Sequence, residues 1–365
     1  MNEAAAQALV LEEPRKLVPR EFSLPDVGDD AGLLRVEACG LCGTDHEQYT
    51  GALTPGFAFV PGHETVGTVE VVGARAAERW GVQPGDRVAV EVFQSCRSCG
   101  PCTRGDYRRC EQHGIFDMYG FIPADRPPGL WGGYAEYQYL GPDAMILPVP
   151  PSLDAVLATV FNPLGAGIRW AVTVPDTKPG DVVVVLGPGI RGLCASAAAK
   201  EAGAAFVMIT GVGAHDAERL AIARSFGADL AVDVSDQDPV AALLDATGGL
   251  ADVVVDVTAK APSAFAQAIS LSRPGGTVVV AGTRGSKRLE GFSPDPIVFK
   301  EIRLLGALGV DAPAYTSALE LLASRPYPFE DLPRRVVGLD GAEELLIDMS
   351  GEGTGTPPVH GVIAP

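Results

Sequence analysis

Asp181–Lys200 reads DVVVVLGPGIRGLCASAAAK, and this stretch decides the fold of the second half of the chain. An apolar run of valines leads into Gly187, Gly189 and Gly192, which complete the pattern G-x-G-x-x-G directly before an alanine-rich helix. Gly187 would permit a tight turn, Gly189 would let backbone amides reach a pyrophosphate at the positive helix N-terminus, and Gly192 would let helix and strand pack closely. The pattern therefore predicts a dinucleotide-binding turn; the alternative is a strand-turn-helix junction whose glycines serve geometry alone.

The same alternation of strand and helix extends from about residue 165 to residue 282. Runs rich in β-formers, such as AFVMITG (205–211) and ADVVVDV (251–257), alternate with alanine-rich runs such as AERLAIARSFGA (217–228). Strands that are apolar on both faces and take turns with helices indicate a parallel sheet covered by helices. We predict a doubly wound α/β domain in this region.

The flanking segments differ from the α/β region. Residues 30–150 contain short strand-like runs broken by Gly and Pro, such as LLRVEA and GGYAEYQYL, which indicate a β-rich unit with few helices. After Gly282 the alternation fades and the remaining runs are too few for a third domain, so we expect the tail to return to the first unit. The alanine-rich start, MNEAAAQALVLEEPRK, is expected to be frayed.

The strand AFVMITG ends at Thr210 and Gly211, where an NAD-binding protein usually has a carboxylate that holds the ribose hydroxyls. Gly211 removes that acid and leaves space for a 2′-phosphate, but the nearest cationic candidates are His215 and Arg219. The expected cofactor is therefore NAD(H) or NADP(H), with a slight preference for NAD. The predicted cofactor-binding residues are Gly187, Gly189, Ile190, Arg191, Gly192, Gly211, Arg219 and Gly282.

Length and charge limit the kinds of protein that this chain can be. Its 365 residues exceed one typical domain, and an apolar content of 47% is enough for two cores. A formal charge of −18 argues against nucleic acid or an anionic membrane as a partner, since both attract cationic surfaces. No apolar run reaches the roughly 18 residues of a membrane span, and the acidic N-terminus is unlike a signal peptide. We expect a cytoplasmic protein with a small-molecule substrate.

Seven cysteines in a reduced compartment favour metal binding over disulfides. The run CRSCGPCTRGDYRRC gives Cys96, Cys99, Cys102 and Cys110 the spacing C-x2-C-x2-C-x7-C, whose four thiolates can surround one zinc ion. Because such a site leaves no position open for a substrate, we predict a structural zinc site. The alternatives are an iron–sulfur cluster or four surface thiols gathered by chance.

A second candidate metal site combines two segments of the chain. CGLCGTDH (39–46) contains Cys42, and FVPGHETVG (59–67) contains His63 and Glu64. One thiolate and one imidazole, with a carboxylate nearby, suit a catalytic zinc that keeps one position for substrate. Taken alone, His63 would be interpreted as a hydrogen-bonded turn residue, and its pairing with the cysteine segment favours the metal site.

These segments together resemble the zinc-dependent medium-chain alcohol and polyol dehydrogenases over nearly the whole chain. The matching pieces, in the order of the family, are CGLCGTDHEQYTG, PGHETVG, GDRVAVE, the four-cysteine run, GGYAEY, GPGIRG and PGGTVVVAG. The resemblance implies a GroES-like β-rich catalytic domain interrupted by a Rossmann domain, and NAD(P)-dependent oxidation of an alcohol at zinc. The implied domains are residues 1–163, with a structural zinc lobe at 94–112, residues 164–308, and residues 309–365 as the return to the first domain.

Carried over residue by residue, the resemblance assigns roles at the second metal site. Cys42 falls on the family's first zinc ligand and His63 on the second. Glu64 falls on the acid that lies behind the zinc and can swing in to bind it. Thr44 falls on the hydroxyl that hydrogen-bonds the alcohol oxygen and passes its proton outward, whereas Cys39 falls on a strand position that usually packs.

Two positions depart from the family pattern. The stretch FNPLGAGIRW puts Asn162 where the family has a Cys, Asp or Glu as third ligand, and a neutral amide is a poor zinc donor. Glu64 or water would then complete the shell, or the site holds zinc weakly or not at all. The relay histidine of many alcohol dehydrogenases falls on Glu47, with His46 one place earlier, so Glu47 either ends the proton path or is a solvated surface acid.

The resulting hypothesis is an NAD(P)-dependent alcohol dehydrogenase that interconverts an alcohol with a ketone or aldehyde. Zinc would act as a Lewis acid, Thr44 would carry the proton away, and the nicotinamide would accept the hydride. A secondary or cyclic alcohol, or a polyol, is the expected substrate, and the resemblance implies a homodimer or homotetramer joined through the Rossmann domains. The alternatives are a zinc-independent NAD(P)H reductase of activated double bonds or quinones, which Asn162 favours, and a non-catalytic dinucleotide-binding module.

Overall fold

The computed structural model describes residues 5–259, 261–285, 287–354 and 357–365. The chain divides into two compact units. The first unit comprises residues 1–161, 319–324 and 329–365, and the second comprises residues 162–318 and 325–328. The chain thus enters the first unit, leaves it for the second and then returns.

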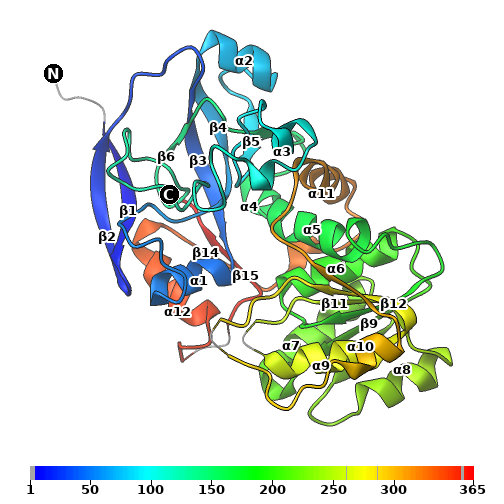
Figure 1. Cartoon of the computed structure of the whole chain (residues 1–365). Helices are drawn as coiled ribbons and strands as arrows, with labels where there is room; N and C mark the ends of the chain where they lie inside the picture. Colours follow the sequence, from blue (N-terminus) through cyan, green and yellow to red (C-terminus); the bar gives the residue numbers. More distant parts are fainter. Residues whose placement is uncertain (1–4, 260, 286, 355–356) are drawn as a thin grey trace. The chain divides into compact units, whose positions relative to one another are not determined.

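The first unit is built mainly from β-strands (Figure 1). Among its described residues the main sheet has the strand order β14-β15-β3-β4-β5-β7, with β6 paired to β3 beside this path. The pairs are antiparallel except for β14 with β15. The strands are β1 (Ala5–Glu13), β2 (Lys16–Ser23), β3 (Gly32–Leu41), β4 (Glu64–Val72), β5 (Arg87–Val90), β6 (Tyr137–Leu140), β7 (Ile146–Pro148), β14 (Arg334–Val337) and β15 (His360–Ile363). The α-helices that lie wholly in this unit are α1 (Gly43–Thr50), α2 (Ala74–Trp80), α3 (Gly100–Thr103), α4 (Ala155–Ala158) and α12 (Ala342–Met349).

Strands β3 and β4 position the residues of the second candidate metal site. Their antiparallel register pairs Gly40 with Glu64. Cys42 follows the last residue of β3, and His63 precedes the first residue of β4, so both leave the ladder at the same end. Helix α1 begins directly after Cys42, which is its N-cap residue.

The N-terminal segment from Ala5 onward is a strand, and the expectation of a frayed start was wrong for this part of the chain. Strand β1 pairs antiparallel with β2 along its length, from Ala5 to Glu13. Ala6, Ala8 and Val10 are buried in the core of the first unit. The alanines gave no strand signal because strand formation here depends on pairing and burial rather than on intrinsic propensity.

The second unit is a doubly wound α/β fold, as the sequence predicted. Among its described residues, parallel strands form one sheet in the order β10-β9-β8-β11-β12-β13. Counted from β8 this is the order 3-2-1-4-5-6 of a Rossmann fold, which reverses between β8 and β11. The crevice at the carboxyl ends of the strands, beside this reversal, is where such folds bind their ligands.

Helices lie on both faces of this sheet (Figure 1). The strands are β8 (Val182–Leu186), β9 (Phe206–Gly211), β10 (Leu230–Asp233), β11 (Ala251–Asp256), β12 (Ser272–Val280) and β13 (Arg303–Gly306). The helices are α5 (Phe161–Ile168), α6 (Ile190–Glu201), α7 (Gly213–Ile222), α8 (Pro239–Thr247), α9 (Pro262–Leu271) and α10 (Asp295–Phe299), while α11 (Ala312–Ser324) continues into the first unit.

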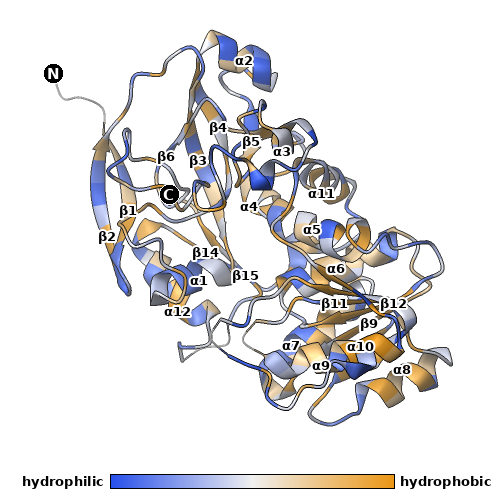
Figure 2. Cartoon of the chain, in the orientation of Figure 1, coloured by the Kyte–Doolittle hydropathy of each residue, from blue (hydrophilic) through white to orange (hydrophobic). Residues whose placement is uncertain are grey.

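The core of the second unit is centred on its sheet. Val183, Val184 and Val185 of β8 have no exposed surface, although successive side chains of a strand point to opposite faces. Strands β9 and β11 are buried in the same way, and Figure 2 shows the hydrophobic colouring of this sheet. Burial on both faces explains why these strands are uninterrupted apolar runs in the sequence.

One helical run among the described residues, Ala155–Thr173, is long and apolar enough to span a membrane by length and composition alone. The sequence analysis expected no run of this length; Thr159, Asn162 and Arg169 lie among the apolar residues of this one. However, 78% of an 18-residue stretch of this run is buried inside the structure, as expected of a helix that belongs to a protein core. Core packing therefore accounts for its composition.

Replacement of Gly192 by alanine tests the close packing of α6 against β8. An added Cβ would lie 1.8 Å from the carbonyl oxygen of Gly187, so we expect Gly192→Ala to lower the free energy of unfolding by about 2 kcal/mol or more in chemical denaturation. Gly189→Ala is the matched control, because nothing lies within 4 Å of its added Cβ and its φ of −65° suits alanine. Equal destabilisation by the two changes would contradict the packing argument.

Candidate metal centres and dinucleotide site

Cys42 and His63 lie close enough to bind one metal ion. The Sγ atom of Cys42 and the Nε2 atom of His63 are 3.2 Å apart, and both residues are buried. A thiolate and an imidazole nitrogen on one tetrahedral zinc lie about 3.5 Å apart, given bonds of about 2.3 and 2.0 Å. The two side chains therefore fit two donors of a zinc site.

Asp45 joins this cluster from the first turn of α1. Its Oδ2 atom accepts a hydrogen bond from the Cys42 backbone N–H at 2.9 Å, and the Cys42 thiol accepts one from the Thr44 N–H at 3.3 Å, which together form a capping box. The Oδ1 atom of Asp45 lies 3.7 Å from Nδ1 of His63, and both atoms are buried without a hydrogen-bond partner in the described part of the chain. The separation of 3.7 Å is longer than a hydrogen bond, so Asp45 lies beside the ring nitrogen that faces away from Cys42 without being bonded to it. Donor atoms of Cys42, Asp45 and His63 all lie within 4.8 Å of one another.

Cys39 and Tyr134 pack near this cluster as uncharged side chains. Burial and then the Asp45 carboxylate raise the pKa of the Cys39 thiol well above its usual value of 9. Burial and then the same carboxylate raise the pKa of Tyr134 well above 10. Cys39 lies in β3 with no exposed surface, and the ring of Phe121 lies 6.4 Å from that of His63. Cys39 is therefore a packed, protonated thiol, as expected, and Cys42 is the thiol that faces His63.

Thr44, Glu47 and Glu64 differ in their relation to the cluster. Thr44 is half-buried in the first turn of α1, and Glu47 is half-buried three residues later, on the same helix face. Glu64 begins β4 and is buried, but among the described residues it does not join the group of mutually close donor atoms. Its Oε2 atom faces Gly40, where an added Cβ would be 2.5 Å away.

His46 is engaged elsewhere in the first unit. Its Nε2 atom lies 3.0 Å from Oε1 of Glu352, and the Oε2 atom of Glu352 pairs with Arg15 at 2.9 Å. The hydrogen bond from Arg15, followed by that from His46, lowers the pKa of Glu352. Helix spacing places a residue two positions after Thr44 on another face, so Glu47 rather than His46 shares the face of Thr44.

Asn162, the predicted third-ligand position, lies in α5 of the second unit. Its buried side chain donates from Nδ2 to the hydroxyl of Tyr315 at 2.9 Å. The amide therefore has a structural role within its own unit.

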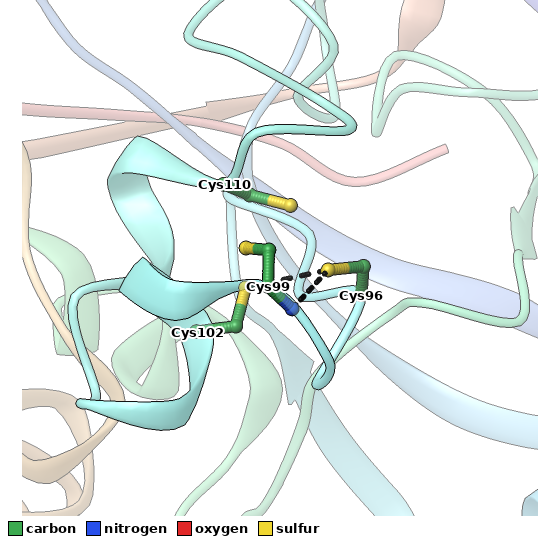
Figure 3. Close-up of side chains that lie close together, drawn as sticks. All are labelled: Cys96, Cys99, Cys102 and Cys110. Atoms are coloured by element: carbon green, nitrogen blue, oxygen red, sulfur yellow. Dashed lines mark hydrogen bonds between the residues drawn. The ribbon is translucent and has the colours of Figure 1, made fainter.

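The four cysteines at 96–110 lie close together in the first unit (Figure 3). All four Sγ atoms are within 4.8 Å of one another, and those of Cys96 and Cys102 are 3.8 Å apart. Two thiolates on one tetrahedral zinc with bonds of about 2.3 Å are also about 3.8 Å apart. Hydrogen bonds from Ser98 and then Cys99 lower the pKa of Cys96 to about 6, which favours the thiolate that zinc requires. Donor type and spacing fit a zinc site without an open position.

A pocket of about 420 Å³ opens at the carboxyl ends of β8, β9 and β11 in the second unit. Predicted cofactor residues that line it are Gly187, Gly189, Arg191, Gly192 and Gly211. The other three predicted residues are not among those that line it. Ile190 is the first residue of α6, and Arg219 pairs with Asp216. Gly282 packs so closely on Thr258 that an added Cβ would lie 2.0 Å from the Thr258 carbonyl oxygen. The pocket therefore brings the glycine motif together with the end of β9.

Arg191 adds a side-chain cation to the start of α6. Its guanidinium carbon lies 5.3 Å from the centre of the Trp170 ring, a cation–π distance. Trp170 lies in a π-helical turn, η2 (Arg169–Thr173), and donates from Nε1 to the carbonyl oxygen of Gly309 at 2.9 Å. The fixed ring thus holds Arg191 where the helix N-terminus already favours an anion such as a pyrophosphate.

Asp45 and Asp216 are the site residues that the sequence analysis missed. Asp45 stands inside the quoted CGLCGTDH segment, and its position three residues after an N-cap was the available signal for a capping box. Asp216 lines the dinucleotide pocket from the first turn of α7. An acid was expected at Gly211, the last residue of β9, rather than in the helix that follows it.

A Rossmann unit with a dinucleotide pocket, combined with a β-rich unit that carries two clusters of zinc-type donors, defines a zinc-binding oxidoreductase. Residues 28–151 match the model of the alcohol dehydrogenase GroES-like domain, and residues 192–324 match the model of the zinc-binding dehydrogenase. The chain therefore belongs to the zinc-dependent alcohol dehydrogenase family.

Individual relatives agree with this assignment. The chain is 70% identical over 363 residues to the "Probable alcohol dehydrogenase adh" of Mycobacterium tuberculosis, with 99% of each chain covered. It is 32% identical over 339 residues to the erythritol/L-threitol dehydrogenase of Mycolicibacterium smegmatis, with 89% of each covered. An NADP-bound structure of a Sinorhizobium meliloti protein classed as a zinc-binding dehydrogenase has a TM-score of 0.85 and 27% identity, and the match covers 99% of this chain and 100% of that one. The predicted fold class, family and NAD(P)-dependent alcohol oxidoreductase activity are confirmed.

Replacements of Cys42 separate its candidate role as metal donor from its role as N-cap of α1. Cys42→Ser keeps an oxygen that can cap the helix, whereas Cys42→Ala loses both the donor and the cap. By elemental analysis, we expect the zinc content of both variants to be about one ion per chain, compared with about two in the parent protein. We also expect the alanine variant to be less stable than the serine variant by about 1 kcal/mol. An unchanged zinc content in both variants would rule out Cys42 as a ligand.

Proposed function

We propose that this protein oxidises the hydroxyl group of a secondary, cyclic or polyol alcohol with NAD(P), at a zinc ion held by Cys42 and His63. The observation that carries the proposal is the 3.2 Å separation of Cys42 Sγ and His63 Nε2, with the unpartnered Oδ1 of Asp45 behind the opposite nitrogen of the ring. A carboxylate beside the second ring nitrogen can orient a histidine ligand once the two atoms approach to hydrogen-bond distance from their present 3.7 Å. When bound, zinc supplies a Lewis acid that lowers the pKa of an alcohol.

Thr44 is the proposed first acceptor of the substrate proton. It stands two residues after Cys42 in the first turn of α1, and its backbone N–H is bonded to the Cys42 sulfur. That bond keeps the Thr44 backbone beside the thiol, and we propose that the hydroxyl faces the same site. A hydroxyl both accepts and donates a hydrogen bond, so it can take a proton on one side and release one on the other.

Glu47 is the proposed next group on the proton path. It lies one turn after Thr44 on the same face of α1 and is half-buried, so it can connect the site to water. His46 is held by Glu352 and lies off this face. Asp45 acts on His63 alone in this scheme, because its other oxygen is bonded to the Cys42 backbone.

The second unit is proposed to hold the dinucleotide in the pocket at the ends of β8, β9 and β11. Backbone amides at the start of α6, together with Arg191, would bind the pyrophosphate. The nicotinamide would then accept hydride from the alcohol carbon. Glu64 remains a proposed alternative ligand for the zinc. Asn162 is a poorer donor because its amide is neutral and bonded to Tyr315.

A panel of alcohols assayed with NAD and with NADP tests the proposed activity. The panel should include four-carbon polyols, since a relative with 32% identity is named as an erythritol/L-threitol dehydrogenase. Reduction of either cofactor by any alcohol, together with about two zinc ions per chain, would support the proposal. If the protein instead holds about one zinc ion per chain and reduces only quinones or enones, it is a zinc-independent reductase and the proposal is wrong.

Thr44→Val removes the hydroxyl while preserving the size of the side chain. We expect kcat for alcohol oxidation to fall by about 100-fold or more, because the proton path loses its first acceptor. Thr44→Ser should recover most of the activity, and the zinc content of both variants should be unchanged. Full turnover in the valine variant would exclude Thr44 from the path, and full turnover in Glu47→Gln would exclude Glu47.

We also propose that the protein is a homo-oligomer joined through the second unit and that it works in the cytoplasm. Strand β13 is one of the two ends of the sheet order, and Val298 and Phe299 of the preceding α10 are 70% and 82% exposed. An open edge beside exposed apolar side chains favours pairing with a second copy. Light scattering should show a dimer or tetramer that Phe299→Asp weakens; a monomeric parent protein would contradict this.

The cytoplasmic assignment rests on the four free thiols of the zinc lobe, which need a reducing compartment.

A further inference from the structure

Gly211 stands where a dinucleotide-binding strand usually ends in an acid, and the packing leaves no room for a side chain there. A Cβ added to Gly211 would lie 2.8 Å from Cγ of Pro188 and 2.9 Å from Cβ of Asp216. The space into which a side chain at position 211 would extend is therefore taken by Asp216, which comes from the first turn of α7. The strand-end acid is missing, but a carboxylate is supplied to the same place from the next helix.

The carboxylate of Asp216 is fixed at the end of β9. Its Oδ2 atom accepts the N–H of Val212 at 2.9 Å, and its Oδ1 atom lies 3.1 Å from Nδ1 of His215 and 3.2 Å from a guanidinium nitrogen of Arg219. The side chain is 14% exposed and lines the dinucleotide pocket. A carboxylate has about four lone-pair sites, so these three contacts leave Oδ2 able to accept another hydrogen bond.

Asp216 places a negative charge on the wall of the pocket next to the end of β9. Arg219 pairs with Asp216, and its side chain, 13% exposed, is not among the residues that line the pocket. Among the described lining residues, the basic side chains are His215 and Arg191, and Arg191 is held at the start of α6 by Trp170. A 2′-phosphate, with about two negative charges at neutral pH, would meet the Asp216 carboxylate at this wall.

We propose that Asp216 binds a hydroxyl of the adenosine ribose and selects NAD(H) over NADP(H). A free ribose hydroxyl donates a hydrogen bond to Oδ2, whereas an ionised 2′-phosphate has no proton to donate and is repelled by the carboxylate. The inference rests on the proposed dehydrogenase function, because it concerns the cofactor of that reaction. It concerns binding alone, and so it can be tested without a substrate.

Binding titrations of the full-length, zinc-loaded protein with NADH and with NADPH, in the absence of alcohol, test the proposal. We expect the parent protein to bind NADH at least about tenfold more tightly than NADPH, and Asp216→Asn to lower that ratio by about tenfold, through weaker NADH binding and stronger NADPH binding. Asparagine keeps an oxygen for the Val212 N–H, and Asp216→Ser is a second variant in case the first is unstable. Thermal unfolding confirms that each variant is folded.

Glu218→Gln is the matched control, because it removes one negative charge from the same helix at an exposed residue outside the pocket lining. The ratio should stay unchanged in this variant. Equal or tighter binding of NADPH by the parent protein, or equal shifts in Asp216→Asn and Glu218→Gln, would overturn the role of Asp216. Absence of binding by either dinucleotide would overturn the dehydrogenase proposal together with this inference, whereas selective NADH binding without alcohol oxidation would contradict only the proposed activity.

Discussion

The register between β3 and β4 is the constraint on which the candidate catalytic site depends. Because Gly40 pairs with Glu64, Cys42 and His63 emerge at the same end of the ladder and approach to 3.2 Å, although 21 positions separate them in the chain. Successive side chains of a strand alternate between faces, so a slip of one residue would turn each side chain toward the opposite face. Burial along β3 and β4 makes such a slip costly. The geometry of the metal donors is thus set by the sheet, and α1 then adds Asp45 and Thr44 through its capped first turn.

Features with short-range sequence patterns could be predicted from the sequence. The alternation of apolar strands and alanine-rich helices identified the Rossmann unit, since strands buried on both faces must be apolar throughout. The four cysteines of the zinc lobe lie within fifteen consecutive residues, and their Sγ atoms do gather within 4.8 Å. In both cases the local sequence already contains the information that determines the structure.

Features that depend on distant partners were missed or left open. The alanines of β1 gave no strand signal, because their burial depends on β2 and on residues far along the chain. Asp216 was overlooked because its approach to Gly211 arises from the way α7 packs against the end of β9. Such contacts follow from tertiary packing, which overrides local propensity.

The first unit is assembled from two parts of the chain that are far apart in sequence, and this has a consequence for its biosynthesis. Strand β15 pairs with β3, but its residues 360–363 leave the ribosome only after the whole second unit has been made. At about 5–20 residues per second, the 157 residues from 162 to 318 occupy the ribosome for roughly 10–30 s. Throughout that time residues 39–41 of β3 lack their β15 partner, so the nascent chain carries an open stretch of sheet edge next to the candidate zinc ligands until translation nears residue 363.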